Sequence, residues 1–444
     1  MMPDKLLIKN GTIITLGDTP RVLDDHVVLI EDGLIIKVAH SADFDDNYDR
    51  IINADGKIIL PGFINAHMHF YSTFARGLGR AEPAHNFNQV LQNLWWRLDQ
   101  SLTLEDCYFS ALTAMLDAIR HGTTTLIDHH ASPNAISGSL DKIADAARQT
   151  GLRVCLCYET SDRDGPRISN QGLEENRTFI RSCIKEKSDF LKASFGLHAA
   201  FTLEDATLEI AANMGQELQS GFHIHVAEAQ SDQDHNLDRH GMRVVERLHR
   251  FGLLGPKTIA AHCVHVDDHE IDLLAKTETK VIHNPQSNMN NAVGIMDLIR
   301  LHDRGVTVGL GTDAMTVNML EELRASLWSQ HLLNQDPSVG FSEVTATLLH
   351  NNANIASQFW DLALGAVEEG SAGDVIIVDY QPPTPLNGDT FLGHLVFGIP
   401  HALVDTTIVG GRILMENKKI LLDLDEHEIA AKARELALSL WNRF

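Results

Sequence analysis

Several residue types are scarce in this sequence, and each shortage excludes a class of protein. Only 5 of the 444 residues are cysteine. Five scattered cysteines are too few for a disulfide framework, so we expect a reducing compartment, the cytoplasm. No apolar run approaches the ~20 residues that a membrane-spanning helix needs, so we expect no membrane partner. The opening MMPDKLLIKNG also lacks the basic and then apolar stretches of a secretory signal.

Basic residues are scarce as well. Lysine and arginine number 36 against 60 acidic residues, which gives a formal net charge of −24 at pH 7. A chain of this charge is repelled by polyanions, so we expect no nucleic acid partner. The remaining composition, 44% hydrophobic and 22% charged, is typical of a globular protein. The length allows roughly two or three average domains, or one large barrel with an accessory domain.

Two of the five cysteines lie close together, in the apolar stretch GLRVCLCYE. Alternation along a strand would point Cys155 and Cys157 to the same face. A metal or redox pair is the alternative, but we expect packed, reduced thiols.

Both ends of the chain are typical of antiparallel strands. Asn10-Gly11 and Asp32-Gly33 each separate two apolar runs, which predicts hairpins. The C-terminal part returns to this pattern in GDVIIVDY and in TTIVGGRILMENKKI, which contains Gly410-Gly411. A last segment, EHEIAAKARELALSLWNRF, has apolar residues at helical spacing. We therefore expect a small β-sandwich domain built from residues 1–58 and 366–444, including the final helix.

Residues 59–365 alternate between short apolar runs and helical stretches. Alternation of this kind predicts a parallel sheet. Eight such units fit a (β/α)₈ TIM barrel better than the alternative, a doubly wound open sheet. The runs are KIILPGFINAHMH, TTTLIDHH, RVCLCYE, KASFGLHA, GFHIHVAE, TIAAHCVH, TKVIHNP and TVGLGTD.

Histidines and carboxylates gather at the ends of these eight runs. The chain has 24 histidines, and a random scatter would not favour strand ends. In a TIM barrel the chemistry lies at the C-terminal ends of the strands. The residues at the run ends are His67, His69, Asp128, His129, His130, Glu159, His198, His225, Glu228, His262, His283, Asn284 and Asp313.

Four of these residues form a candidate metal site. His67 and His69 are two apart, so both imidazoles can point into the barrel mouth. With His225 and Asp313 they supply three imidazoles and one carboxylate, a set that suits Zn²⁺ or Fe²⁺. The alternative is that these are barrel histidines satisfied without a metal.

Three residues are candidate catalytic groups. Glu228 follows His225 by three residues, where it could move a proton between an activated water and a leaving group. His262 could orient the water or polarise the substrate, and Asp313 could accept a proton as well as bind metal. The structural alternatives are a helix N-terminal carboxylate for Glu228 and a helix N-cap for Asp313. Gly309 and Gly311 have no Cβ, so neighbouring parts of the chain can approach the last strand closely.

At these residues the chain resembles the amidohydrolase superfamily. PGFINAHMH is similar to the first-strand motif of the branch that includes cytosine, guanine and S-adenosylhomocysteine deaminases and triazine chlorohydrolases. HVAE, AHC, NPQSNM and GTD resemble its later strand motifs. NLWWRLDQSLT and YETSDRDG most resemble segments of the aminohydrolases of the SsnA type. The resemblance covers essentially the whole chain.

The resemblance implies one divalent ion, zinc or alternatively iron, bound by His67, His69, His225 and Asp313. It implies that Glu228 shuttles protons and that His262 contacts the water or substrate. His198 stands where the binuclear branches carry a carboxylated lysine, so the resemblance makes it a substrate-binding candidate. A homodimer is also implied.

Three further residues are candidate substrate contacts. Arg163 follows the third run and could bind polar substrate edges. Trp95 lies in the segment after the first run, where it could stack on a planar ring, pack in the core or form a dimer contact. Asn288 could bind substrate or order its own loop.

These features predict a metal-dependent deaminase that hydrolyses an amino-substituted nitrogen heterocycle, a small molecule such as a purine or pyrimidine. One alternative is hydrolysis of another bond at the same site, a C–Cl bond or a cyclic amide or imide. A non-catalytic binding or assembly protein is the alternative of a different class.

Overall fold

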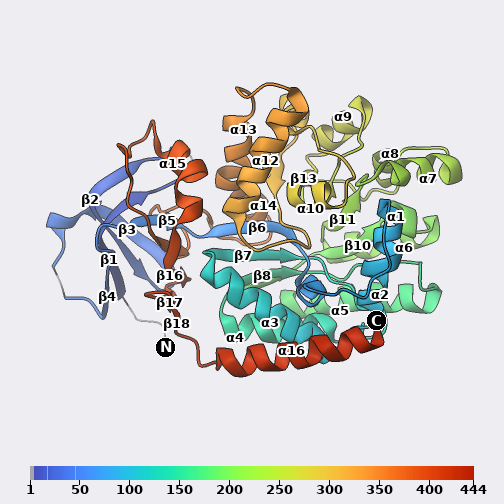
Figure 1. The fold of residues 1–444 in the computed structure, drawn as a ribbon, viewed down its shortest axis with the longest axis horizontal. Coiled ribbons are helices and arrows are strands. Elements are labelled where there is room, and N and C mark those ends of the chain that lie inside the picture. The colour runs from blue at the N-terminus through green and yellow to red at the C-terminus, as the bar shows by residue number, and fades with distance from the viewer. Residues whose placement is uncertain (1–4, 18, 46) are drawn as a thin grey trace.

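The computed structural model describes residues 5–17, 19–45 and 47–444. A barrel surrounded by helices occupies most of the molecule, and a sheet built from both ends of the chain lies at one side of it (Figure 1). None of the helices among these residues has the length and apolar character that crossing a bilayer requires.

Eight parallel strands form the barrel, which confirms the predicted fold. The fourth strand is interrupted at Ser194, so its two halves pair with different neighbours. A bridge between Met68 and Asp313 joins the first strand to the last and closes the barrel, which excludes the open-sheet alternative. The strands are β6 (Phe63–Met68), β7 (Thr123–Asp128), β8 (Arg153–Leu156), β9 (Leu191–Ala193) with β10 (Phe195–Ala199), β11 (Phe222–Val226), β12 (Ile259–His262), β13 (Lys280–His283) and β14 (Val308–Leu310).

Helices cover the outside of the barrel. The first, α3, begins at a capping box in which Thr103 and Asp106 satisfy each other's backbone groups. Its apolar face packs in the buried cluster around Leu126 and Val154 of the neighbouring strands. The helices are α3 (Leu104–Arg120), α4 (Ser139–Thr150), α5 (Pro166–Glu186), α6 (Asp205–Leu218), α7 (Gln230–His240), α8 (Val244–Arg250), α9 (Asp268–Lys276), α10 (Pro285–Asn290), α11 (Leu298–Asp303), α12 (Met319–Asn334), α13 (Phe341–Ala346) and α14 (Asn352–Ala356).

Strands from both chain ends form one hydrogen-bonded sheet. The sheet branches at β1, which pairs with β2 on one side and with β4 and β5 on the other. Ile30 from one wing and Ile377 from the other share an apolar core, so the wings pack on each other as in a sandwich. The strands are β1 (Lys5–Ile14), β2 (Val22–Glu31), β3 (Leu34–His40), β4 (Arg50–Asn53), β5 (Ile58–Pro61), β15 (Val375–Asp379), β16 (Leu403–Val409), β17 (Arg412–Glu416) and β18 (Lys419–Ile420).

Two of the predicted tight turns are confirmed and one is wrong. Asp32-Gly33 connects β2 to β3, and Gly410-Gly411 connects β16 to β17. Asn10-Gly11 instead lies inside β1, where the register with β2 shifts on both sides of Gly11. Asn10 adopts a left-handed backbone there. The pair is thus a bulge within a continuous strand, because both halves of β1 pair with the same partner.

The final helix, α16 (Glu426–Arg443), lies along α3 on the barrel (Figure 1). Its buried Leu436 and Leu440 join the apolar cluster that includes α3. The helix that follows the terminal strands in the sequence therefore contacts the barrel, near the segment that follows β6.

All five cysteines are free and buried, as expected for packed thiols. Burial raises the pKa of the Cys107 thiol to about 12. The group is thus a protonated thiol at neutral pH.

Candidate active site

The first and last barrel strands meet closely at the rim. The backbone N–H of Thr312 donates to the His67 carbonyl at 2.9 Å, and the His69 N–H donates to the Asp313 carbonyl at 3.2 Å. A Cβ on Gly311 would lie 2.7 Å from the His67 carbonyl oxygen and 2.6 Å from Oδ1 of Asn284. Glycine is therefore required here, which confirms the predicted close approach at the last strand.

Three strand ends at the rim have a left-handed backbone. The φ angles are 45° at Ala227, 76° at His262 and 51° at Asp313. Side chains other than glycine rarely adopt this conformation, and it is found preferentially at functional sites.

The four predicted metal ligands come together at this rim. Oδ1 of Asp313 lies 2.8 Å from Nε2 of His69 and 3.4 Å from Nε2 of His67. Nε2 of His225 lies 3.3 Å from Nε2 of His69. Converging nitrogen and oxygen atoms at these separations surround a point that a small cation can occupy.

The polar atoms left unpaired here fit a divalent ion. Nε2 of His67 and Nε2 of His262 are buried and have no hydrogen-bond partner among the described residues. Ligand atoms of His67, His225, His262 and Asp313 all lie within 4.8 Å of one another. Buried imidazole nitrogens require a partner, and a first-row metal ion supplies one to several of them at once.

The electrostatics of the cluster favour a cation. Burial opposes charge on His69, yet the Glu159 and Asp313 carboxylates raise its pKa well above the ordinary value. Burial likewise opposes ionisation of Asp313, but the neighbouring imidazoles of His67 and His69 lower the pKa of its carboxyl well below the usual range. Burial lowers the pKa of His67 to about 4, so this imidazole is neutral, as a metal ligand must be.

A second set of groups holds the candidate ligands in orientation. Nδ1 of His67 lies 2.8 Å from Nε2 of His223, and Nδ1 of His69 lies 2.5 Å from the His129 carbonyl oxygen. The Ser287 hydroxyl donates to the second oxygen of Asp313. Such contacts fix which ring nitrogen is free to bind metal. His223 was absent from the predicted site, although it lies two residues before His225 on the same face of β11.

Glu228 lies beside this cluster, within reach of His262. Its Oε2 is 3.5 Å from Nε2 of His262, and Asn291 donates to its Oε1 at 3.4 Å. Burial, followed by repulsion from Asp313, raises the pKa of the Glu228 carboxyl well above its usual range. A carboxyl of raised pKa in a pocket is suited to taking up and releasing a proton.

Neither Glu228 nor Asp313 caps a helix, as the structural alternatives for these two carboxylates required. Asp232 supplies the side chain that accepts from the backbone at the start of α7, including the Glu228 N–H at 3.0 Å. Asn318, not Asp313, caps α12. Both Glu228 and Asp313 are thus left to face the cavity.

His262 is held from behind by Asn288. Oδ1 of Asn288 lies 2.8 Å from Nδ1 of His262, and the Asn288 side chain is fully buried. Asn288 is not among the residues that line the cavity. Its position thus favours orientation of His262 over contact with a substrate.

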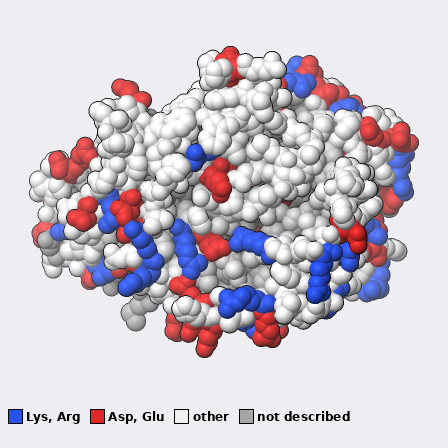
Figure 2. Space-filling view, viewed as in Figure 1, with Lys and Arg blue, Asp and Glu red and all other residues white. Residues whose placement is uncertain are grey.

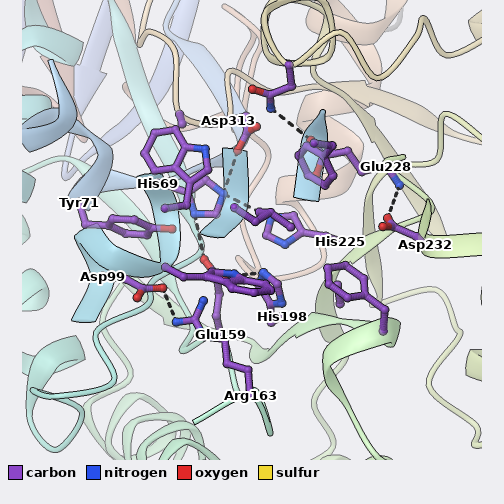
Figure 3. Close-up of a pocket in the computed structure, with 18 residues that line it drawn as sticks. His69, Tyr71, Asp99, Glu159, Arg163, His198, His225, Glu228, Asp232 and Asp313 are labelled. Atoms are coloured by element: carbon purple, nitrogen blue, oxygen red, sulfur yellow. Dashed lines mark hydrogen bonds and ion pairs between the residues drawn. The ribbon is translucent and has the colours of Figure 1, made fainter. Parts of the chain in front are cut away.

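A cavity opens in front of the cluster, and several predicted substrate contacts line it (Figure 3). The segment after β6 forms one wall and contains η2 (Phe70–Ala75), α1 (Phe87–Val90), η3 (Leu91–Trp95) and α2 (Trp96–Gln100). Trp95 lies edge-on to Tyr71, with ring centroids 6.4 Å apart. Arg163 lies on the wall and pairs with the buried carboxylate of Asp99. His198 lies on the same side, so Trp95, Arg163 and His198 all face the cavity.

Glu159 also lines the cavity, although no role was predicted for it. Its Oε1 lies 3.1 Å from Nδ1 of His69 and 3.7 Å from Nδ1 of His129. Its Oε2 lies 3.9 Å from Nε2 of His198 (Figure 3). Its place at the end of the third run was the one signal in the sequence that could have identified it.

Comparison with known proteins identifies relatives along the full length of the chain. The profile of the family described as "Amidohydrolase family" matches residues 58–414. A 5-methylthioadenosine/S-adenosylhomocysteine deaminase from Syntrophomonas wolfei is 32% identical over 441 residues, covering 98% of this chain and 99% of the relative. A 5'-deoxyadenosine deaminase from Methanobrevibacter smithii is 32% identical over 441 residues, covering 98% of each.

Solved structures show the same architecture. A zinc-bound adenosine deaminase from Xanthomonas campestris superimposes with a TM-score of 0.87 at 22% identity, covering 99% of both chains. An atrazine chlorohydrolase from Arthrobacter aurescens in complex with zinc has a TM-score of 0.82 at 21% identity and covers 97% of this chain and 100% of its own. At these identities the likeness establishes the fold alone.

Proposed function

Because the chain belongs to the Amidohydrolase family, we propose that it is a metal-dependent deaminase that hydrolyses an amino-substituted heterocycle. The observation that carries this proposal is the convergence of three imidazoles and Asp313 at the barrel rim, with Glu228 beside them. The overall reaction replaces the exocyclic amine with oxygen, using one water and releasing one ammonia.

We assign the metal site to His67, His69, His225 and Asp313, and we propose one zinc ion. A bound divalent ion supplies Lewis acidity that lowers the pKa of a coordinated water toward neutrality. The nitrogen-rich ligand set suits Zn²⁺, and Fe²⁺ is the alternative.

Glu228 handles the protons in this proposal. Its carboxylate takes a proton from the attacking water and delivers it to a ring nitrogen, and a second transfer protonates the departing amine. His262, held by Asn288 through Nδ1, presents Nε2 to the same space and positions the attacking oxygen. Among the described residues, the Glu228 carboxyl accepts one side-chain hydrogen bond, from the Asn291 amide, which leaves the carboxyl free to exchange protons.

An adenosine-type nucleoside is the substrate class we propose. Relatives that are 32% identical over the whole chain have names that specify deamination of 5'-deoxyadenosine, methylthioadenosine and S-adenosylhomocysteine. The cavity also offers an aromatic wall of Trp95, Trp96 and Tyr71 on which a planar base can stack.

Glu228→Gln tests the proposed chemistry. We expect ammonia release to fall about 10²–10⁴-fold, because the amide cannot exchange a proton, while the metal content stays unchanged. Glu209→Gln on the exposed side of α6 is the matched control and should retain full activity. Unchanged ammonia release by Glu228→Gln would exclude this role.

The substrates should be a panel of adenosine-type nucleosides, guanine, cytosine and a chlorotriazine. Chloride release without ammonia release would point instead to the dehalogenating alternative. Less than stoichiometric metal in metal-replete protein would favour a non-catalytic binding role.

We further propose that the protein forms homodimers and acts in the cytoplasm. Exposed apolar side chains lie on α12 and on α15 (Phe391–Phe397), which contact each other: Trp328, Leu332 and Phe397. Few charged side chains lie over the region where Figure 1 places α12 and α13 (Figure 2). Such a face suits a second copy of the chain. The five free thiols support a reducing compartment.

A further inference from the structure

Glu159 and His198 lie next to each other on the cavity wall, at the ends of the third and fourth barrel strands (Figure 3). Glu159 is 5% exposed and His198 is 7% exposed. Both line the cavity that His225 and Asp313 also line. A substrate held over the candidate metal ligands therefore lies within reach of both side chains.

Hydrogen bonds around Thr202 indicate which nitrogen of His198 carries the proton. The Thr202 hydroxyl donates to the Ala199 carbonyl at 3.0 Å and lies 2.8 Å from Nδ1 of His198. A hydroxyl has only one proton to donate. Since that proton goes to Ala199, Nδ1–H of His198 donates to Thr202. Nε2 of the neutral imidazole is then an acceptor, and it is the nitrogen nearer to Glu159.

The two carboxylate oxygens of Glu159 face different imidazoles. Oε1 faces the imidazoles of His69 and His129, at 3.1 and 3.7 Å. Oε2 is the oxygen that faces Nε2 of His198, at 3.9 Å. An ionised carboxylate offers lone pairs and no proton. Two hydrogen-bond acceptors therefore stand side by side with no proton between them.

We propose that Glu159 and His198 form an acceptor pair that binds two neighbouring hydrogen-bond donors of the substrate and thereby selects it. This inference rests on the proposed deaminase function. A vicinal diol of a ribose carries such donors, and so does the N–H edge of an amino-oxo ring. A ligand without them leaves two buried acceptors unpaired, and a site built for hydrogen bonding rejects such analogues strongly.

Binding to the zinc-loaded Glu228→Gln protein tests the pair, because this variant is expected to bind ligand without consuming it. Calorimetry should compare 5'-deoxyadenosine with its 2',3'-dideoxy counterpart, and guanine with 1-methylguanine. We expect the donor-bearing member of one pair to bind at least about tenfold more tightly. The pair of ligands that shows this difference identifies the source of the donors.

Adding Glu159→Gln should abolish that difference, because the amide replaces one acceptor with a donor. Affinity for the donor-free ligand should change less than about twofold. The proposal is overturned if both ligands lose affinity equally, if neither does, or if Glu159→Gln loses its metal. The last result would show that Glu159 acts through His69.

Thr202 provides a second variant that leaves both acceptor groups in place. Thr202→Val removes the hydroxyl that holds Nδ1–H, so His198 can present a proton instead, and the preference for donor-bearing ligands should fall. Thr202→Ser should restore it. A preference that survives in Thr202→Val would contradict the assigned proton position. These binding results are independent of turnover, whereas failure to release ammonia from any substrate in the wild type would overturn the proposed function.

Discussion

The two halves of the cavity are built in different ways. On the inner half, His69, His225 and Asp313 lie at the ends of barrel strands that hydrogen-bond directly to their neighbours. On the outer half, Trp95 and Asp99 belong to the segment after β6, which lies outside the barrel ladder. The barrel strands thus fix the candidate metal ligands, whereas the aromatic wall depends on a segment that needs separate support.

Helix α16 provides much of that support. The Trp441 indole N–H donates to the Phe74 carbonyl at 2.7 Å, and Arg97 donates to the Phe444 carbonyl at 2.6 Å. The Arg443 guanidinium reaches the Ser101 carbonyl at 3.0 Å. The outer wall of the cavity is therefore braced by residues more than 300 positions away in the sequence.

Removal of an inner ligand should have the largest effect. In His225→Ala we expect metal content to fall well below one ion per chain and activity to fall by about 10³ or more, since the Lewis acid contributes several kcal/mol to the transition state. Elemental analysis and ammonia release measure the two effects. His269→Ala on the exposed surface of α9 is the control. Full metal occupancy and activity in His225→Ala would place the metal elsewhere.

Breaking the ion pair of the outer wall should reduce stability rather than metal binding. Asp99 is 2% exposed, and Asp99→Asn removes the buried carboxylate that pairs with the Arg163 guanidinium, which keeps its second partner, Asp164, at 2.9 Å. The free energy of unfolding should fall by about 2 kcal/mol, since a charged hydrogen bond is lost. Denaturant unfolding of the metal-loaded protein measures this change.

The double variant Asp99→Leu/Arg163→Met controls for the broken ion pair. It should recover much of the stability but not the affinity for substrate. Loss of metal in either variant would mean that the two halves of the cavity are coupled more tightly than their contacts indicate.

Weakening the contacts between the C-terminal residues and the segment after β6 should have a smaller effect on activity. Arg97→Met removes the hydrogen bond to Phe444 and the stacking of the guanidinium over its ring, 4.3 Å from the centroid. A loss of about 1 kcal/mol should raise KM about fivefold with kcat unchanged. Arg434→Met, on the exposed face of α16, should leave both constants unchanged. A fall in kcat alone would show that the contact between Arg97 and Phe444 affects the candidate metal cluster rather than substrate binding.

The thiols should show no effect in the folded protein. Burial raises the pKa of Cys107 and Cys183 to about 12 from the ordinary 9.0, so at pH 8 the thiolate fraction falls about 1000-fold. At pH 9 the thiolate of Cys107 and Cys183 is still only about 0.1% in the folded protein, whereas about half of an ordinary thiol is ionised in unfolded chains. Iodoacetamide labelling followed by mass analysis should therefore modify all five cysteines in urea and none before unfolding. Rapid labelling of the native protein would contradict the burial of these thiols.

The difference between the two halves also explains what the sequence could predict. His67 and His69 share a strand face, and the strand-end rule places them with Asp313, so three of the residues that converge at the rim follow from alternation together with that rule. The outer wall follows no such rule. The pairing of Asp99 with Arg163, and the contacts of α16 with the segment after β6, depend on how irregular segments fold over the barrel.

Two errors of omission have the same physical origin. His223 obeys the same alternation as His225, but residue spacing does not show that its Nε2 lies 2.8 Å from Nδ1 of the candidate ligand His67. Glu159 was recognisable as a strand-end carboxylate, yet its role depends on the proton position of His198, which is set by Thr202. Hydrogen-bond direction of this kind is not visible in residue spacing.

Zinc titration of the metal-free protein tests the central claim most directly, because the proposed site binds one ion and that ion is required for deamination. Ammonia release should be absent without metal, should rise linearly with added Zn²⁺, and should reach its plateau at one ion per chain. A plateau at two ions per chain, or undiminished activity without metal, would contradict the account.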